Sequence, residues 1–550
     1  MTILTINRKE FESKVGKLTK ELEEKITQMG TPVEEVNDKT FSVEIFPNRP
    51  DLLSMQNFAL ALNQFRGKKG VVKFSINKPE KDFIVTVDKS VKEVRPYTVC
   101  AIVKGLKLNK EKIEEIIDVQ EKLHGSIGRK RKKLAIGIYP LEKIKMPIKF
   151  HALKSDEIKF QPLESNKEMT GKQILKNHPR GKEYANLLKD YKTFPIFSDA
   201  DNKILSMPPI INSEETGRIG ETTKDIFIEC SGSNLFYLKK CLNILVATFS
   251  EMGGKIYTME IKDAKEKNFI SPDMGFEERE FKIEDIEKTL GIKLTKKEIR
   301  KYLERMGIGF EERKEKIVAL IPPYRTDILH WIDLAEEVAI AYGYENFKSE
   351  LPKISTVAEE DKSEKTKRII SEILAGVGLL ETSSFHITTK KNIKKMHYDF
   401  RDFLELEESK TERDVLRIDL LTNLLQIFSE NSDASYPQKI FEMGRVFSRD
   451  SSGTSETGIL ERENLAIALI DESVGFTDLK QILDYFFKML SVEYKIREVE
   501  NNNYILGRVG SILVEGKEVG FIGEVAPRVL KNWKLKMPVV ALEIDLGFLG

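Results

Sequence analysis

Four carboxylates between residues 327 and 337 have the chemistry and the spacing of a site for a hard metal ion. Asp333, Glu336 and Glu337 lie three and four residues apart, so on one helix they can converge on a single point. Asp327 lies a turn and a half earlier and reaches that point only from the helix start. Oxygen donors without Cys or His suit magnesium or calcium, and the absence of alternating loop carboxylates argues against an EF-hand. The alternative is a solvated acidic helix face.

The chain before these carboxylates predicts where their helix begins. Pro322 and Pro323 prevent helix formation, and Thr326 is a residue type that caps helices. We therefore predict a helix from about 327 to 342.

The whole segment 322–344, PPYRTDILHWIDLAEEVAIAYGY, resembles the magnesium-bearing segment of the phenylalanyl-tRNA synthetase beta-subunit family. That family's pattern is a Pro, an Arg and Asp, a second Asp, paired Glu, and a Gly flanked by Tyr. The resemblance implies magnesium as the cofactor, with four ligands: Asp327, Asp333, Glu336 and Glu337.

A second motif of the same family lies near the N-terminus. Residues 48–54 read NRPDLLS, inside a turn that two prolines and the flanking Asn and Asp make compact. A purely structural turn is the alternative reading of these residues. The resemblance therefore extends from the first part of the chain to the acidic segment.

Residues 197–234 resemble the editing domain of the archaeal and eukaryotic cytosolic type of the family. A pocket that accepts phenylalanine by apolar contact rejects an analogue with one extra hydroxyl only about a hundredfold, so a second, hydrolytic site must remove tyrosine. The resemblance places four residues in that pocket: Ser206, Asn212, Glu229 and Ser231. The chain departs from the family with Ser231 and Asn234, where a Thr and an Asp are expected. Polar residues of turns and strand ends are the alternative.

Residues 129–133, RKRKK, are the densest basic run. Consecutive cations repel one another, which predicts a position on the surface or in a loop. A solvated loop is one reading. With a tRNA partner implied by the resemblance, the other is a phosphate contact through Arg129, Arg131 and Lys132.

The last part of the chain, 351–550, resembles a class II synthetase domain that lacks its catalytic motifs. We expect an antiparallel sheet with helices on one face. Arginines would hold the ATP phosphates in a working class II site. Here the second-motif strand reads KIFEMGRVF, residues 439–447, without an Arg-x-Glu signature, and VVALEIDLGFLG, residues 539–550, has no Arg. The resemblance thus implies that ATP and phenylalanine bind an alpha subunit in an α2β2 heterotetramer.

Together these patterns predict an α+β multidomain protein with four parts: an N-terminal α+β domain at 1–85, an editing-like tRNA-binding domain at 86–270, a small magnesium-bearing helix–strand domain at 271–350, and the degenerate synthetase core at 351–550. The 550 residues suffice for several cores. Local patterns add five expectations: an amphipathic stretch from Phe11 to Ile26, a helix from Leu235 to Phe249, a capping box of Thr295 and Glu298, a core-facing helix stripe of Ile369, Ile370, Ile373, Leu374 and Val377, and a closing strand from Val539 to Ile544.

Composition sets the remaining limits. With 89 basic and 88 acidic residues the net charge is +1, so any RNA contact must be a local patch. Three cysteines without a CxxC pair argue against a disulfide framework and a zinc site. The N-terminus has no apolar leader and no long apolar run follows, so we expect a cytoplasmic protein without a membrane partner.

The resulting functional hypothesis is a phenylalanine–tRNA ligase beta subunit that supports ATP-dependent charging by its alpha subunit, binds phenylalanine tRNA and hydrolyses mischarged tyrosyl-tRNA. No P-loop, GxSxG, HExxH or dinucleotide fingerprint competes with it. Two alternatives stay open: a non-catalytic scaffold for RNA or protein, and a stand-alone metal-dependent hydrolase.

Overall fold

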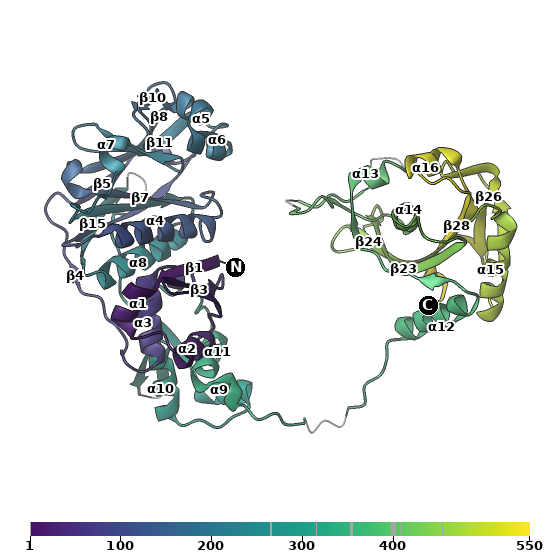
Figure 1. Ribbon diagram of the computed structural model, residues 1–550, viewed down its shortest axis with the longest axis horizontal. Helices are drawn as coiled ribbons and strands as arrows, with labels where there is room; N and C mark the ends of the chain where they lie inside the picture. The colour runs from purple at the N-terminus through teal and green to yellow at the C-terminus, as the bar shows by residue number, and fades with distance from the viewer. Residues whose placement is uncertain are drawn as a thin grey trace. The chain divides into compact units, whose positions relative to one another are not determined.

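The computed structural model describes residues 2–263, 267–314, 316–351, 356–397, 403–407, 409–453 and 455–549. The chain divides into two compact units, Met1–Leu351 and Pro352–Gly550 (Figure 1). Both units mix helices with sheets, as the sequence predicts.

The first unit opens with a three-stranded sheet and three helices. The sheet has the order β1-β3-β2, with β1 Thr2–Asn7, β2 Val33–Val36 and β3 Thr40–Ile45. The amphipathic stretch from Phe11 to Ile26 is two helices, α1 Arg8–Val15 and α2 Lys20–Gln28. The break lies at Gly16, whose φ of 108° suits glycine. The NRPDLLS segment forms a short turn of helix, Pro50–Leu53, followed by α3 Met55–Phe65.

An eleven-stranded mixed sheet forms most of the first unit. Its main order is β13-β12-β11-β8-β5-β15-β6-β14-β7, and β16 and β4 pair with β15. The strands are β4 Ile76–Asn77, β5 Ile84–Val87, β6 Tyr97–Lys104, β7 Leu134–Pro140, β8 Ile148–Lys154, β11 Thr193–Ser198, β12 Ile204–Met207, β13 Ile211–Asn212, β14 Ile226–Gly232, β15 Lys255–Asp263 and β16 Phe269–Ser271. Strand β4 lies within the segment predicted as the first domain, yet it pairs with this sheet.

Helices cover the sheet near its β7 edge. Helix α8, Leu235–Glu251, is buried along most of its length and packs against β6 and β14, and α4, Lys110–Gly125, contacts β7 (Figure 1). Shorter elements surround the other end: β9 Lys159–Phe160, β10 Met169–Thr170, α5 Gly171–Asn177 and α6 Pro179–Tyr184. Helix α7, Glu214–Gly217, contacts both β12 and β7. The β7 edge is therefore flanked by a helix and by the loops around β13.

The acidic segment belongs to a small module of three strands and three helices. Strands β17 Glu277–Phe281, β18 Gly309–Arg313 and β19 Lys316–Ile321 form a sheet of order β17-β19-β18, next to α9 Ile283–Leu290 and α10 Lys296–Arg305. The predicted capping box of Thr295 and Glu298 is confirmed. The acidic helix, α11, runs Trp331–Tyr342, so the predicted start at 327 is wrong. His330 and not Thr326 caps it, because Asp333 turns back to the backbone N–H of His330.

The second unit is a seven-stranded sheet with helices on both faces. The order is β20-β23-β24-β28-β27-β26-β25, antiparallel apart from the β20–β23 pair. The strands are β20 Leu380–Glu381, β23 Gln438–Arg449, β24 Ile459–Ile470, β25 Tyr494–Glu498, β26 Tyr504–Val514, β27 Lys517–Val525 and β28 Val539–Asp545, and β21 Ile387–Thr388 and β22 Val415–Leu416 form a separate pair.

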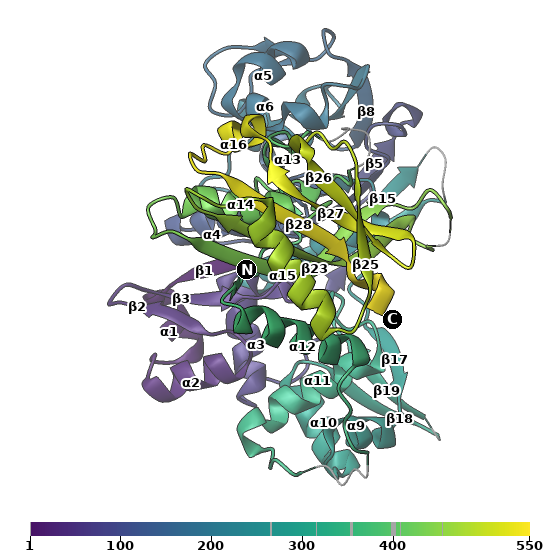
Figure 2. The ribbon, with the colours of Figure 1, turned by 90° about the vertical axis from the view of Figure 1, so that its right-hand side faces the viewer.

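Two cores sandwich this sheet. Helices α14 Leu421–Glu430 and α16 Pro527–Asn532 cover one face, and α12 Lys362–Gly376 and α15 Phe476–Met489 cover the other (Figure 2). A short helix, α13 Lys390–Ile393, precedes α14. Alternate residues of β28 enter the two cores, Ala541 in one and Leu542 in the other. The expectation of helices on one face only is therefore wrong, because β28 is apolar on both sides.

One further expectation about the second unit needs correction. Ile370 and Leu374 of α12 are buried as predicted, but Ile369 is 50% exposed and lies outside the core stripe.

No helix in the part of the chain that the structure describes combines the length and the apolar character needed to cross a lipid bilayer.

Candidate functional site

A cavity of about 460 Å³ lies at the β7 edge of the large sheet. Its walls come mainly from α4, β7 and the segment 208–219, and apolar and polar groups contribute to them almost equally. Nine polar side chains line the cavity: Gln120, Glu121, His124, Arg131, Glu164, Arg180, Asn212, Arg218 and Glu229. A concave site that combines apolar walls with converging polar groups can bind a small molecule or one end of a larger substrate.

Strand pairing brings Glu229 and Asn212 to the side-chain hydroxyl of Tyr139. Glu229 lies opposite Gly137 across β14 and β7, and Tyr139 lies two residues farther along β7. Tyr139 Oη is 3.4 Å from Glu229 Oε1 and 3.4 Å from Asn212 Oδ1. One phenol hydrogen can be donated to only one of these acceptors at a time. The cluster is therefore loosely bonded and has capacity for another hydroxyl.

Burial sets the charge of Glu229. The residue is 1% exposed, and burial raises the pKa of its carboxyl from 4.5 to about 8, against the opposing effects of Arg95 and Tyr139. At neutral pH the carboxyl is mostly protonated. It can then both donate and accept a hydrogen bond.

Two glycines make room for this polar cluster. A Cβ on Gly137 would lie 2.2 Å from Tyr139 Oη and 2.5 Å from Glu229 Oε1. A Cβ on Gly217 would lie 2.7 Å from the Cβ of Asn212. Any larger residue at either position would displace the polar side chains.

Two buried oxygens of this region have no hydrogen-bond partner among the described residues: Ser206 Oγ and Glu229 Oε2. Ser206 is 1% exposed and lies opposite Asn212 across β12 and β13. An unpaired buried polar group costs about 1–3 kcal/mol, so these two oxygens are open to a water molecule or to a ligand. The structure thus brings three of the four predicted pocket residues together.

Ser231, the fourth predicted residue, faces another partner. Its Oγ accepts a hydrogen bond from Arg95 Nε at 3.0 Å, and its carbonyl accepts one from Arg95 Nη2 at 2.6 Å. Burial lowers the pKa of Arg95 to about 10, and the Glu229 carboxyl opposes that shift. Ser231 therefore holds a buried cation near Glu229. Asn234, the second departure, caps α8 by accepting from the N–H groups of Phe236 and Tyr237.

The basic run 129–133 lies in a loop, as predicted, but Arg131 lies in the cavity wall and is only 8% exposed. Its guanidinium pairs with Glu121 at 2.7 Å and donates to the Ile210 carbonyl at 2.9 Å. Arg129 and Lys132 are exposed. Arg131 therefore shapes the cavity wall, and only its neighbours in the run face solvent.

His124 completes this wall and was not predicted. Its Nε2 accepts the backbone N–H of Ile136 at 2.9 Å, so the ring hydrogen is on Nδ1, 3.5 Å from Glu121 Oε1. Burial lowers the pKa of His124 to about 4, and the adjacent His124 ring together with the Arg131 guanidinium lowers the pKa of Glu121 to about 2. The spacing of Glu121 and His124 by three residues on one helix is the only sequence signal for this pair.

The predicted metal ligands are engaged with other groups. Arg325 is 2% exposed and its guanidinium contacts Asp327 at 2.7 Å and Glu337 at 2.8 Å. Asp333 Oδ2 accepts the N–H groups of Leu329 and His330, both at 2.7 Å. No three His, Cys, Asp or Glu residues within the described ranges are placed to hold a metal ion.

Glu336 is the remaining member of the acidic set. Partial burial, followed by the negative charges of Glu337, Asp333 and Asp327, raises its pKa. A guanidinium already supplies the positive charge between Asp327 and Glu337. The four carboxylates in this arrangement do not fit a magnesium ion, and we derive no chemistry from one.

The two motif segments of the first unit touch each other. Arg49 pairs with Asp51 at 2.8 Å within the NRPDLLS turn. Thr326 Oγ1 donates to the Asn48 carbonyl at 3.5 Å, which joins this turn to the segment before α11. The two motifs therefore meet at one polar junction, where the joining hydrogen bond is exposed.

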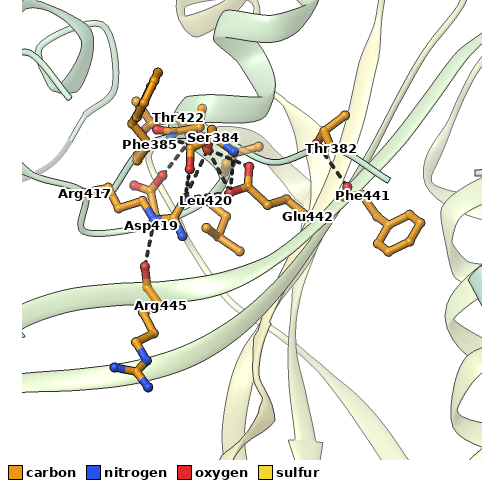
Figure 3. A network of polar contacts seen from close by, with 12 residues as sticks. Thr382, Ser384, Phe385, Arg417, Asp419, Leu420, Thr422, Phe441, Glu442 and Arg445 are labelled. Carbon is orange, nitrogen blue, oxygen red and sulfur yellow. Dashed lines mark hydrogen bonds and ion pairs between the residues drawn. The ribbon is translucent and has the colours of Figure 1, made fainter. Parts of the chain in front are cut away.

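The second unit has its own buried ion pair, shown in Figure 3. Arg417 Nη1 contacts Glu442 Oε1 at 2.6 Å, and its Nε donates to the Arg445 carbonyl at 2.7 Å. Ser384 Oγ lies 2.7 Å from Glu442 Oε2. Both charged side chains are 2% exposed. Protein groups therefore occupy the Nε and Nη1 of this guanidinium.

Comparison with known proteins matches both units. Residues 279–344 match the family described as "tRNA synthetase B5 domain", and residues 347–546 match "Phenylalanyl tRNA synthetase beta chain CLM domain". A phenylalanine–tRNA ligase beta subunit of Thermococcus sibiricus is 39% identical over 506 residues, which cover 91% of this chain and 89% of that one. Another from Archaeoglobus fulgidus is 34% identical over 553 residues, which cover 100% and 98%.

A solved structure supports the assignment of the first unit. The crystal structure of an N-terminal fragment of the phenylalanyl-tRNA synthetase beta subunit from Pyrococcus horikoshii is 35% identical, with a TM-score of 0.59. It covers 62% of this chain and 99% of that fragment. The resemblance inferred from the motifs is confirmed, and the chain belongs to the family of phenylalanine–tRNA ligase beta subunits, chains of an aminoacyl-tRNA synthetase.

Proposed function

We propose that this chain hydrolyses tyrosyl-tRNA in the cavity beside β7, as the editing part of a phenylalanine–tRNA ligase. The observation that carries the proposal is the buried cluster of Glu229, Tyr139 and Asn212, with its long hydrogen bonds and its unpaired Glu229 Oε2. The resemblance of residues 197–234 to the family's editing domain agrees with it.

The cluster suits recognition of a phenol. Tyrosine differs from phenylalanine by one hydroxyl, and a site built to bond that hydroxyl can reject the analogue lacking it by about 10⁴–10⁵. A protonated Glu229 can donate to the substrate phenol or accept from it. We assign Glu229 and Asn212 to the phenol, with Tyr139 giving up one of its 3.4 Å contacts when the substrate enters.

The reaction at the other end of the substrate is ester hydrolysis. Water adds to the carbonyl carbon, the bond to the tRNA 3′-terminal ribose oxygen breaks, and tyrosine and uncharged tRNA leave. His124 is a poor general base for this step because Nε2 already accepts the Ile136 N–H and its pKa is about 4. We assign His124, Glu121 and Arg131 to shaping the wall that positions the ester.

We propose that phenylalanine charging itself takes place on an alpha subunit, in an α2β2 heterotetramer that binds ATP, phenylalanine and phenylalanine tRNA there. In the segment of the second unit that carries Arg417, Glu442 and a backbone carbonyl already occupy Nη1 and Nε of the guanidinium, which leaves it poorly placed for bidentate binding of a phosphate. The role of this unit is then to support the alpha subunit.

The test is deacylation of tyrosyl-tRNA by the complex of the two subunits. Glu229→Ala removes the phenol contact, and we expect the rate of tyrosyl-tRNA hydrolysis to fall by at least about 100-fold, with phenylalanine charging unchanged. Glu221→Ala, at an exposed position of the same segment, is the matched control and should deacylate like the wild type.

Three outcomes decide the proposal. Loss of deacylation in Glu229→Ala alone supports it. Equal deacylation by both variants would assign the hydrolysis to another site. A wild-type complex that charges phenylalanine but never deacylates tyrosyl-tRNA would leave this chain as a scaffold for the alpha subunit.

A further inference from the structure

Two segments of the second unit carry cations and no carboxylate. Residues 390–397, KKNIKKMH, contain four lysines, and residues 526–538, APRVLKNWKLKMP, contain one arginine and three lysines. Neither segment has an Asp or a Glu. The whole chain has a net charge of only +1, so this is a local concentration of positive charge.

The fold joins these segments although more than 100 residues separate them. Asn532 Nδ2 donates to the Lys395 carbonyl at 2.9 Å, and Lys395 Nζ lies 3.7 Å from the ring centroid of Trp533. Helices α13 and α16 accordingly lie next to each other in the second unit (Figures 1 and 2). We call this the α13–α16 surface, defined by Lys391, Lys394, Lys395, Lys531, Lys534 and Lys536.

The charges of this surface are poorly compensated. Among the described residues, no carboxylate lies within ion-pair distance of Lys391, Lys531, Lys534 or Lys536, and all four are exposed. Burial and then the positive charges of Lys391 and Lys534 lower the pKa of Lys395, and only Glu430 opposes them. Like charges held this close destabilise the folded unit unless an anion joins them.

Lys390 and Lys391 differ although they are neighbours on the same helix. Lys390 pairs with Glu405 at 2.8 Å and reaches Asp414 at 3.9 Å, so its charge is balanced within the protein. Lys391 has no such partner among the described residues and can meet an external anion.

We propose that the α13–α16 surface binds the phosphate backbone of the tRNA, which rests on the proposed function for the identity of the RNA. Lysine is a flexible point charge that suits phosphates more than bases. Among the described residues of the two segments, Trp533 is the one Phe, Tyr or Trp, and it is 1% exposed beneath Lys395 and not available for base stacking. The contact is thus electrostatic and independent of base sequence, and it positions the tRNA on the second unit.

The experiment measures tRNA binding as a function of salt. The probe is a phenylalanine tRNA transcript, and the protein is the full chain purified with its alpha subunit. The test variant is K391Q/K534Q/K536Q. The control is K488Q/K495Q/K517Q, which removes three exposed lysines from elsewhere in the same unit.

We expect the test variant alone to bind more weakly, by about eightfold at 0.1 M salt for each phosphate that the substituted lysines no longer neutralise. Its plot of log affinity against log salt should also flatten by about 0.9 for each such phosphate. Equal affinities and slopes for the two variants would overturn the proposal. Dissociation of the alpha subunit from the test variant, with an unchanged affinity per assembled complex, would also overturn it and identify a protein interface.

Failure of this proposal is distinguishable from failure of the proposed function. A wild-type complex that does not bind the transcript contradicts the synthetase role itself. A wild-type complex that binds, with both triple variants binding equally well, contradicts only the α13–α16 surface. All six substitutions are at exposed positions, so circular dichroism should show unchanged folding.

Discussion

Gly137 and Glu229 lie directly opposite each other on β7 and β14, and a methyl group on Gly137 would approach Glu229 Oε1 to 2.5 Å. Tyr139, two residues along β7, places its hydroxyl in the same space, 2.2 Å from that methyl position. Because Gly137 has no side chain, the space beside it can hold the hydroxyl of Tyr139 from β7 and the carboxyl of Glu229 from β14.

Gly137→Ala should therefore disable the proposed editing although Tyr139, Glu229 and Asn212 themselves are not substituted. The methyl group must push aside Tyr139 or Glu229, and we expect tyrosyl-tRNA hydrolysis to fall by about 10- to 100-fold because misplaced groups lose their catalytic contribution. The measurement is deacylation by the subunit complex, with phenylalanine charging as the internal reference.

Gly220→Ala is the matched control. It lies in the loop before β14, and the nearest atom to its added Cβ is Thr222 Oγ1 at 4.0 Å. Full hydrolysis by Gly137→Ala would mean that the Glu229–Tyr139 contact is not used in the reaction.

Glu229 should make the first unit less stable as the pH rises. Its pKa is about 8 in the folded chain and 4.5 in the unfolded reference. Between these values the folded chain holds a proton that the unfolded chain has released, so the free energy of unfolding falls with pH. The decrease is at most about 1.4 kcal/mol per pH unit, and it ends above about pH 8.

The check is urea denaturation between pH 5 and 8 for the wild type and for Glu229→Gln, which stays neutral. Fluorescence in a Trp533→Phe background isolates Trp331, the tryptophan of the first unit. Glu543 of the second unit also has a raised pKa, about 7, but it is common to both proteins. Parallel stability curves would show that Glu229 titrates normally.

Glu337 and Glu336 are adjacent in sequence and should differ sharply in mutational cost. Glu337→Ala removes one of two carboxylates that contact the buried Arg325, and breaking such a pair costs about 3–5 kcal/mol. Glu336→Ala relieves repulsion from its acidic neighbours and should change the free energy of unfolding by less than about 0.5 kcal/mol.

The wild type and Glu336→Ala also test the magnesium prediction. Denaturation with magnesium and with EDTA should give the same free energies for the wild-type chain, since Arg325 already balances Asp327 and Glu337. If magnesium stabilises the wild type and Glu336→Ala removes that stabilisation, the metal site inferred from the sequence is correct and Arg325 yields its place to the ion.

Local patterns predicted the elements of this chain well. Helix α8 begins at Leu235 as expected, β28 runs Val539–Asp545 against an expected 539–544, and the Thr295 capping box is present. Each of these is fixed by neighbours within a few residues. Boundaries failed where a specific side chain intervened, as when Asp333 turned back to His330 and started α11 four residues later than 327.

The site could be predicted only in part, because the spacing of residues along the sequence does not determine which residues of two strands pair with each other. Glu229 and Asn212 were named from the family pattern, whereas Tyr139 and Gly137 reach them only through the pairing of β7 with β14. The same limit applies to charge. The run at 129–133 is the densest basic stretch of the sequence, yet its Arg131 is buried. The α13–α16 surface is formed by two segments that are too far apart in sequence for any local pattern to connect them.

The position of β28 has a consequence for synthesis of the chain. Residues 539–545 are the last strand of the second unit's sheet in chain order, but they lie in its interior, between β24 and β27. Until the ribosome has released them, both neighbouring strands keep an unpaired edge and both cores lack a wall, a state prone to aggregation. The second unit therefore completes its folding only after residue 545 has emerged, whereas the first unit can form while translation continues.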